Sequence, residues 1–264
     1  MSEITLKELG VALPPTQDEL PCDDGIPMET QRHKVQMNLL IHSLQPWLEQ
    51  RSDGYASGNM FVYFSLAQVR NQDFRGPDFF AVLGVPKRER KSWVVWEEGK
   101  APDVIIELLS ESTAQADKNE KKLIYQNQLR VPEYFWFDPF NPDDWAGFFL
   151  QHGVYQPIIQ NAQNQLVSQS LGLALQYWHG TYEGVEATWL RWATLDGELL
   201  PTFEEQECQR AEQEHRRAEQ ERQRAEQAES LLQQTIRNLL QEGMTVEQVA
   251  RLTGLSQVQV EQFR

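Results

Sequence analysis

Two carboxylates interrupt an apolar run near the middle of the chain. In KAPDVIIELLSEST, residues 100–113, positions 104–109 are otherwise apolar and predict a buried β-strand. Because side chains alternate along a strand, Asp103 and Glu107 share one face. A buried carboxylate is costly unless it is paired, hydrogen-bonded or bound to a metal. Glu107 therefore needs a partner, which is either Lys121 or Lys122 in a structural salt bridge or a metal ion.

A second carboxylate and a lysine belong to the same candidate site. Asp78 follows a Gly-Pro turn in GPDFF and opens another apolar strand, although an aspartate here also suits a turn. After residue 110, Asp117, Lys121 and Tyr125 are spaced four apart and form one helical stripe, which is also typical of a solvated pair. Two carboxylates with a lysine suit metal-dependent phosphodiester hydrolysis. Carboxylates hold Mg²⁺, and an ammonium positions or deprotonates water and stabilises negative charge.

The elements that position these residues follow from the apolar pattern. A helix is predicted over 29–51, at least as far as Gln45 before Pro46. A strand at 102–109, a hydroxyl-capped helix and a strand at 133–138 form a βαβ unit with parallel strands. Both faces of such a sheet are covered, which explains the continuous apolar run. Further strands are predicted at 59–66 and 78–85, an edge strand or hairpin at 91–99, and a closing β layer at 147–192.

The composition changes at Phe203. The run QRAEQEHRRAEQERQRAEQAES repeats alanine every seven residues, which predicts a long helix that is either a weak coiled coil or a solvated single helix. After Gly243, a capping box at Thr245 and a second helix start at Ser256 have helix-turn-helix spacing. Because the last helix carries mostly glutamines, packing or dimerisation is favoured there over DNA contact. The expected divisions are an N-terminal arm at 1–28, a core domain at 29–200, the charged helix at 201–242 and the tail at 243–264.

Composition limits the possible partners. With Lys+Arg 24 against Asp+Glu 39, the net charge of -15 offers no bulk attraction to nucleic acid. The compact basic cluster PKRERK, residues 86–91, is either a solvated loop, which is favoured, or a local phosphate contact. The chain has neither a long apolar span nor a signal-peptide pattern, and its two cysteines fit a reducing compartment, so we expect a soluble, cytoplasmic protein. The five histidines lack the spacing of a zinc site.

These motifs together resemble a known family. The pattern GPDFF…APDVIIELLSEST…D…K…Y…VPEYFWFDP is similar to the Uma-two family of endonuclease-like proteins, a branch of the PD-(D/E)XK superfamily. The likeness covers roughly residues 25–195 and is closest over 102–139. It implies an α/β fold with a restriction-endonuclease-like mixed sheet flanked by helices. It also implies that Asp78 and Glu107 are the acidic residues of the first and second motifs.

The chain departs from the parent superfamily at its lysine. The ExK pattern requires lysine at position 109, where this sequence has leucine. The resemblance implies that the lysine has moved to the next helix, where the stripe selects Lys121 over Lys122. Glu29 resembles a helix glutamate that sometimes completes such metal sites, although a surface charge is the commoner role. Asp103 is a candidate third ligand or a supporting group.

The sequence thus predicts a Mg²⁺-dependent DNA endonuclease, with Mn²⁺ as a substitute metal. Asp78 and Glu107 are the expected ligands and Lys121 the catalytic lysine. DNA is the expected partner, and a homodimer is expected, possibly through the C-terminal helix. The alternative is a catalytically weak or inactive nuclease-fold module that binds nucleic acid or assembles through its helical tail.

Overall fold

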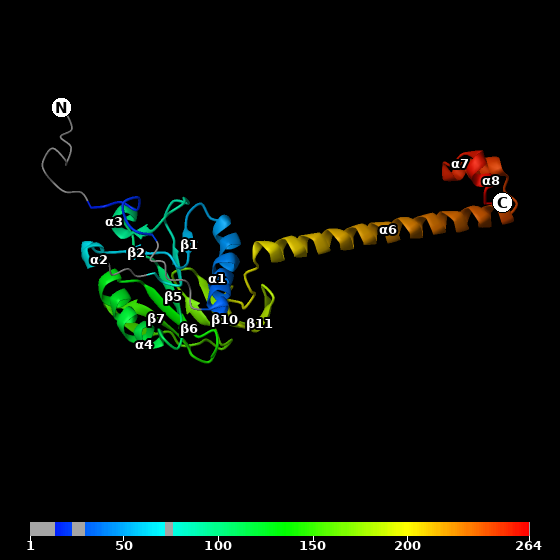
Figure 1. The fold of residues 1–264 in the computed structure, drawn as a ribbon. Helices are drawn as coiled ribbons and strands as arrows, with labels where there is room; N and C mark the ends of the chain where they lie inside the picture. The colour runs from blue at the N-terminus through cyan, green and yellow to red at the C-terminus, as the bar shows by residue number, and fades with distance from the viewer. Residues whose placement is uncertain (1–13, 23–29, 72–75, 264) are drawn as a thin grey trace, which may run out of the picture. The chain divides into compact units, whose positions relative to one another are not determined.

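The chain forms two compact units (Figure 1). A computed structural model describes residues 14–22, 30–71 and 76–263. The first unit is Met1–Phe203 and the second is Glu204–Arg264. No helix within the described residues combines the length and the apolar character needed to cross a membrane.

A six-stranded mixed sheet is the centre of the first unit, in the order β1-β3-β5-β6-β7-β8. Its β5 and β6 run parallel, as the βαβ pattern predicts, and the other neighbours are antiparallel. All of β5 is buried, which agrees with its continuous apolar run. The strands are β1 (Tyr55–Ser57), β3 (Phe79–Val82), β5 (Val104–Leu108), β6 (Glu133–Phe137), β7 (Trp145–Gln151) and β8 (Val154–Pro157).

One face of this sheet packs on α1 (Gln31–Glu49) and on a second sheet of β9 (Leu166–Ser168), β10 (Leu173–Tyr182) and β11 (Val185–Ala193). Thr30 caps α1 through its side chain. The helix continues past Pro46, where the sequence allowed an end, and both Pro46 and Leu48 are buried. The predicted β layer at 147–192 divides between the two sheets, because β7 and β8 extend the main sheet and β9–β11 form the separate one.

A helical segment covers the other face of the main sheet. It comprises α4 (Ala114–Ala116), η1 (Asp117–Lys121), α5 (Lys122–Ile124) and η2 (Tyr125–Leu129), and it ends at Arg130 in the left-handed conformation. The predicted helix is confirmed, but its two π-helical turns are not visible in the sequence pattern. Such turns are rare and frequently lie at functional sites.

A two-stranded parallel sheet lies beside this face and consists of β2 (Val62–Tyr63) and β4 (Trp93–Val94). Two short helices accompany it, α2 (Leu66–Asn71) and α3 (Val95–Glu98). The strand predicted at 59–66 is short, and the edge strand or hairpin predicted at 91–99 becomes a helical turn after Val94. The described part of the N-terminal arm contacts this region: Trp96 Nε1 donates to the Pro15 carbonyl, and Leu20 is buried.

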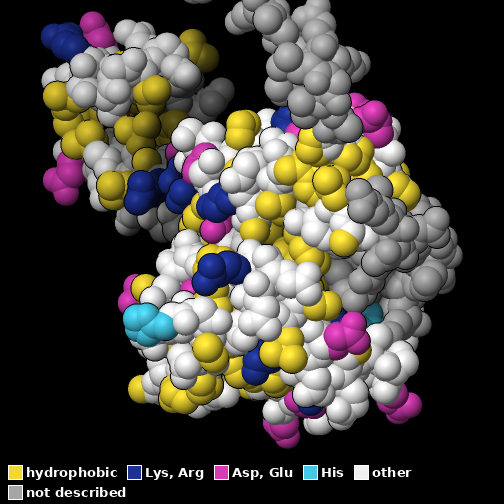
Figure 2. Space-filling view, turned by 90° about the vertical axis from the view of Figure 1, so that its left-hand side faces the viewer, with side chains coloured by type: hydrophobic (Ala, Val, Ile, Leu, Met, Phe, Trp, Pro, Cys, Tyr) yellow, Lys and Arg dark blue, Asp and Glu magenta, His cyan; other side chains and the backbone are white. Residues whose placement is uncertain are grey.

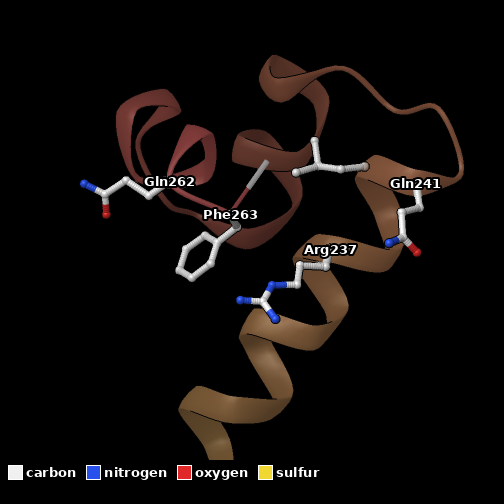
Figure 3. Close-up of a pocket in the computed structure, with 5 residues that line it drawn as sticks. Arg237, Gln241, Gln262 and Phe263 are labelled. Carbon is white, nitrogen blue, oxygen red and sulfur yellow. The ribbon is translucent and has the colours of Figure 1, made fainter.

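The second unit is a long helix followed by two short ones. Helix α6 (Phe203–Gln241) exposes residues 211–230, including its heptad alanines, and buries only Ile236. Ile236 packs with Val249 of α7 (Val246–Thr253) and Val260 of α8 (Gln257–Glu261). The predicted capping box at Thr245 is confirmed, and Ser256 forms another. A shallow pocket between these helices is lined by Arg237, Gln241, Gln262 and Phe263, among others (Figure 3).

Candidate active site

The register of two antiparallel strands sets Asp78 opposite Glu107. In the ladder between β3 and β5, Phe79 pairs with Ile106 and Phe80 with Ile105. Continuing this ladder by one residue pairs Asp78 with Glu107. Phe80 and Ile105 belong to the core that includes Tyr125 of the covering helical segment. Because side chains alternate, both carboxylates point toward that segment.

Glu107 is fully buried, and each of its carboxylate oxygens has a partner from the helical segment. The Tyr125 hydroxyl donates to Oε1 at 2.6 Å. The Lys121 ammonium donates to Oε2 at 3.2 Å and lies 2.7 Å from Asp117 Oδ1. The stripe of Asp117, Lys121 and Tyr125 therefore lies directly over Glu107. An α-helical stripe of spacing four drifts around the axis, and the wider π turns reduce this drift.

Burial perturbs the titration of the two opposed carboxyls. Burial raises the pKa of Glu107 to about 7, with Lys121 opposing the rise and the charge of Asp78 adding to it. Burial also raises the pKa of Asp78 to about 6, while hydrogen bonds from the Leu108 amide, at 2.7 Å, and with Glu107 lower it. Near neutral pH the pair therefore holds a proton readily. Two close carboxylates disfavour each other's ionisation, and a nearby cation would relieve this repulsion.

Negative charge exceeds positive charge at this site. Burial and the charge of Glu107 raise the pKa of Asp117 to about 6. Burial alone would lower the pKa of Lys121, but Glu107 and Asp117 raise it above its ordinary value. Lys121 is therefore an ammonium throughout the physiological range. With Asp78, Glu107 and Asp117 ionised, one lysine faces three carboxylates, so the site attracts cations.

Three of the residues expected at the site come together, and Asp103 does not join them. Asp78, Glu107 and Lys121 converge, so the expected salt bridge of Glu107 exists alongside the carboxylate pair. Asp103 lies at the opposite end of β5, about 13 Å of strand from Glu107. There its Oδ2 accepts from the Leu83 amide at 2.7 Å and from Lys100 Nζ at 2.8 Å. Its expected role as a third ligand or supporting group is thus not reproduced. Glu29 lies outside the described residues.

Lys122 is the alternative to Lys121 as the lysine of the site, and its side chain packs against aromatic rings instead of Glu107. Its Nζ lies 3.3 Å from the centroid of the Phe148 ring and 5.5 Å from that of Trp136. Partial burial lowers its pKa. Adjacent lysines on one helix therefore have different surroundings, and only Lys121 contacts Glu107.

Asp117 is a site residue that the sequence did not single out. Its side chain is 1% exposed, and within the described part of the chain neither of its carboxylate oxygens makes a hydrogen bond of good geometry. Its Oδ1 lies close to the Lys121 ammonium, but the angles of this contact are not those of a hydrogen bond. The sequence does contain a sign of this role, because Asp117 precedes Lys121 by one turn in the stripe of spacing four. That spacing was used only to select Lys121 as the lysine of the site.

The basic cluster at 86–91 is engaged with acidic side chains. The guanidinium of Arg90 is buried, and its Nε lies 2.7 Å from Glu98 Oε1, which Arg88 also contacts at 2.7 Å. Lys91 lies 2.7 Å from Asp18. This pairing leaves little charge for phosphate. On the face seen in Figure 2, Lys and Arg side chains lie scattered among acidic and apolar ones.

The central strand of the main sheet thus carries a buried glutamate that is opposed by an aspartate and covered by a lysine. The sequence profile of the Uma2 family, described as "Putative restriction endonuclease", matches residues 17–183. The chain belongs to this family, as the resemblance predicted, and the matched region contains the whole candidate site.

The chain is also similar to a solved structure, a crystal structure described as "a putative nuclease belonging to DUF820" from Anabaena variabilis. The two sequences are 18% identical, and the similarity covers 55% of this chain and 84% of that one with a TM-score of 0.38. No protein with a curated description matches the chain.

Proposed function

We propose that the protein is a Mg²⁺-dependent DNA endonuclease, with Mn²⁺ as a substitute, whose site consists of Asp78, Glu107 and Lys121. The observation that carries the proposal is the pairing of Asp78 and Glu107 across two strands, with Lys121 3.2 Å from Glu107. Membership in a family described as "Putative restriction endonuclease" supports DNA as the substrate.

The residues present fit a magnesium ion. Mg²⁺ is commonly held by one or two carboxylates and keeps several of its waters. Within the described ranges, no group of three His, Cys, Asp or Glu side chains could hold a metal ion by itself, so Asp117, which contacts Lys121, is not counted as a ligand. Asp78 and Glu107 together with water would hold the ion. In that position Mg²⁺ would offset charge on the phosphate and lower the pKa of water.

The protein's own groups then have distinct tasks. Lys121 is held as an ammonium by Glu107 and Asp117, so it donates hydrogen bonds to the negative charge that develops on the phosphate. The raised pKa makes it a poor proton acceptor, which favours the positioning and stabilising role over deprotonation of water. The Leu108 amide fixes Asp78, and the Tyr125 hydroxyl fixes Glu107, so both carboxylates have defined orientations.

Plasmid cleavage tests this function. Supercoiled plasmid is incubated with Mg²⁺ or Mn²⁺ and the wild type, Glu107→Gln or Lys121→Ala. Lys122→Ala is the matched control, because it removes a neighbouring lysine whose ammonium contacts aromatic rings. We expect cleavage by the wild type and the control, and a loss of about 100-fold or more in the two site variants.

Equal nicking by the wild type and Glu107→Gln would mean that the site does not perform the reaction. Absence of cleavage by the wild type, with Mn²⁺ binding intact, would favour the alternative of an inactive nuclease-fold module that binds nucleic acid or assembles through its tail.

A further inference from the structure

A second concave site lies at the carboxyl ends of β5 and β6. It is a pocket of about 630 Å³, within the size range of small-molecule sites. Its residue Ser110 lies two positions past the end of β5, and neither Asp78 nor Glu107 is part of its lining. Its lining includes His33, Ser110, Ser112, Asp138, Phe140 and Asn141.

The pocket presents an aromatic ring to solvent. Phe140 is 59% exposed. The guanidinium of Arg32 lies 4.8 Å from its ring centroid, and the His33 ring lies 5.8 Å from it. Asp138 Oδ1 accepts from the Phe140 amide at 2.8 Å, which fixes the turn that carries the ring. An aromatic ring held in this way is a stacking platform.

The polar lining suits a neutral ligand with amino groups better than an anion. The carboxylates of Glu111 and Asp138 disfavour a phosphate in the pocket. Carboxylates do accept hydrogen bonds from exocyclic amino groups of bases, such as that of cytosine. Asp138 is oriented for this by the Phe140 and Asn141 amides, at 2.8 and 3.0 Å.

Charge gives a further reason for stacking. The net charge is -15, and the cluster at 86–91 is paired with acids, so phosphate contacts alone offer little affinity. Stacking of a base on an aromatic side chain contributes about 1–3 kcal/mol and tolerates any sequence. A base inside a duplex cannot reach such a ring, whereas an unpaired base can.

We propose that this pocket binds an unpaired nucleobase by stacking on Phe140, and that the substrate class is single-stranded or locally unpaired DNA. The identity of the bound group rests on the pocket alone. The assignment of single-stranded or locally unpaired DNA as the substrate class rests on the proposed function.

Binding in the presence of a chelator tests the pocket separately from cleavage. The probe is a short single-stranded oligonucleotide with one 2-aminopurine, whose fluorescence changes on stacking, and the protein is the full chain. Phe140→Ala should weaken binding about 5- to 150-fold, which is the equivalent of about 1–3 kcal/mol. Phe140→Tyr should retain binding. Ile159→Ala, which removes an apolar side chain that is 80% exposed outside the pocket, should bind as the wild type does.

The outcomes separate the two proposals. Equal binding by the wild type and Phe140→Ala, or competition by duplex as strong as by single strand, would overturn the pocket proposal. Circular dichroism of Phe140→Ala and rescue by Phe140→Tyr exclude misfolding as the cause of weak binding. A wild type that binds the probe through Phe140 but cleaves no DNA would contradict the proposed function and would not contradict the pocket proposal.

Discussion

Replacing Glu107 by Gln measures how much the ionisation of this buried carboxylate lowers the free energy of unfolding. In the metal-free protein burial raises the pKa of Glu107 from 4.5 to about 7. The folded state therefore binds this proton more tightly than the unfolded chain does, and stability falls as pH rises between these two values. The difference corresponds to about 3 kcal/mol, at 1.36 kcal/mol for each pH unit.

Glutamine imitates the protonated acid and can still accept the Tyr125 hydrogen bond. Without metal, Glu107→Gln should match the wild type near pH 4.5 and be more stable by about 3 kcal/mol above about pH 8. This corresponds to a melting temperature about 6–12 °C higher for a domain of this size. The carboxylate that we propose as a metal ligand is thus expected to destabilise the metal-free protein.

Thermal unfolding followed by circular dichroism, with a chelator and over a pH series, measures this difference. Glu120→Gln, which changes an exposed carboxylate beside Lys121, is the matched control and should follow the wild type. If Glu107→Gln shows the same pH dependence as the wild type, or is the less stable protein at high pH, the assigned cost of burying Glu107 is wrong.

Three further substitutions test separate parts of the structure. Tyr125→Phe removes the hydroxyl that donates to Glu107, so it should cost about 1–3 kcal/mol in urea unfolding and shift the pH dependence upward; an unchanged profile contradicts this. Glu133→Ala leaves the Ser168 hydroxyl and two backbone amides without their acceptor and should cost about 3 kcal/mol, yet Mn²⁺ affinity measured by calorimetry should not change. Ile236→Ala should cost the second unit about 2–5 kcal/mol and open α7 and α8 to hydrogen exchange. Equal protection in mutant and wild type would rule out the helical core as described.

The sequence was most informative where one physical rule dominated. The run at 104–109, apolar except for Glu107, predicted a strand covered on both faces, and the burial of every residue of β5 confirms it. Capping chemistry likewise placed the start of α7 at Thr245. In both cases the local pattern has one favourable solution.

The parts that the sequence did not predict depend on long-range pairing. Alternation showed that Asp103 and Glu107 share a face, but only the β3–β5 register sets Asp78 opposite Glu107. Asp103 was overvalued, although Lys100 three residues earlier offers it a local partner. Asp117 was undervalued, because a spacing of four cannot show whether a pair lies in solvent or over a buried glutamate.

A crystal grown with Mn²⁺ tests the central claim most directly. Anomalous difference density at the manganese edge should show one peak at bonding distance from both the Asp78 and the Glu107 carboxylates, near Lys121, and no peak there in Glu107→Gln. A wild-type crystal with no peak between these two carboxylates, at a pH above about 8 where both are ionised, would contradict the account.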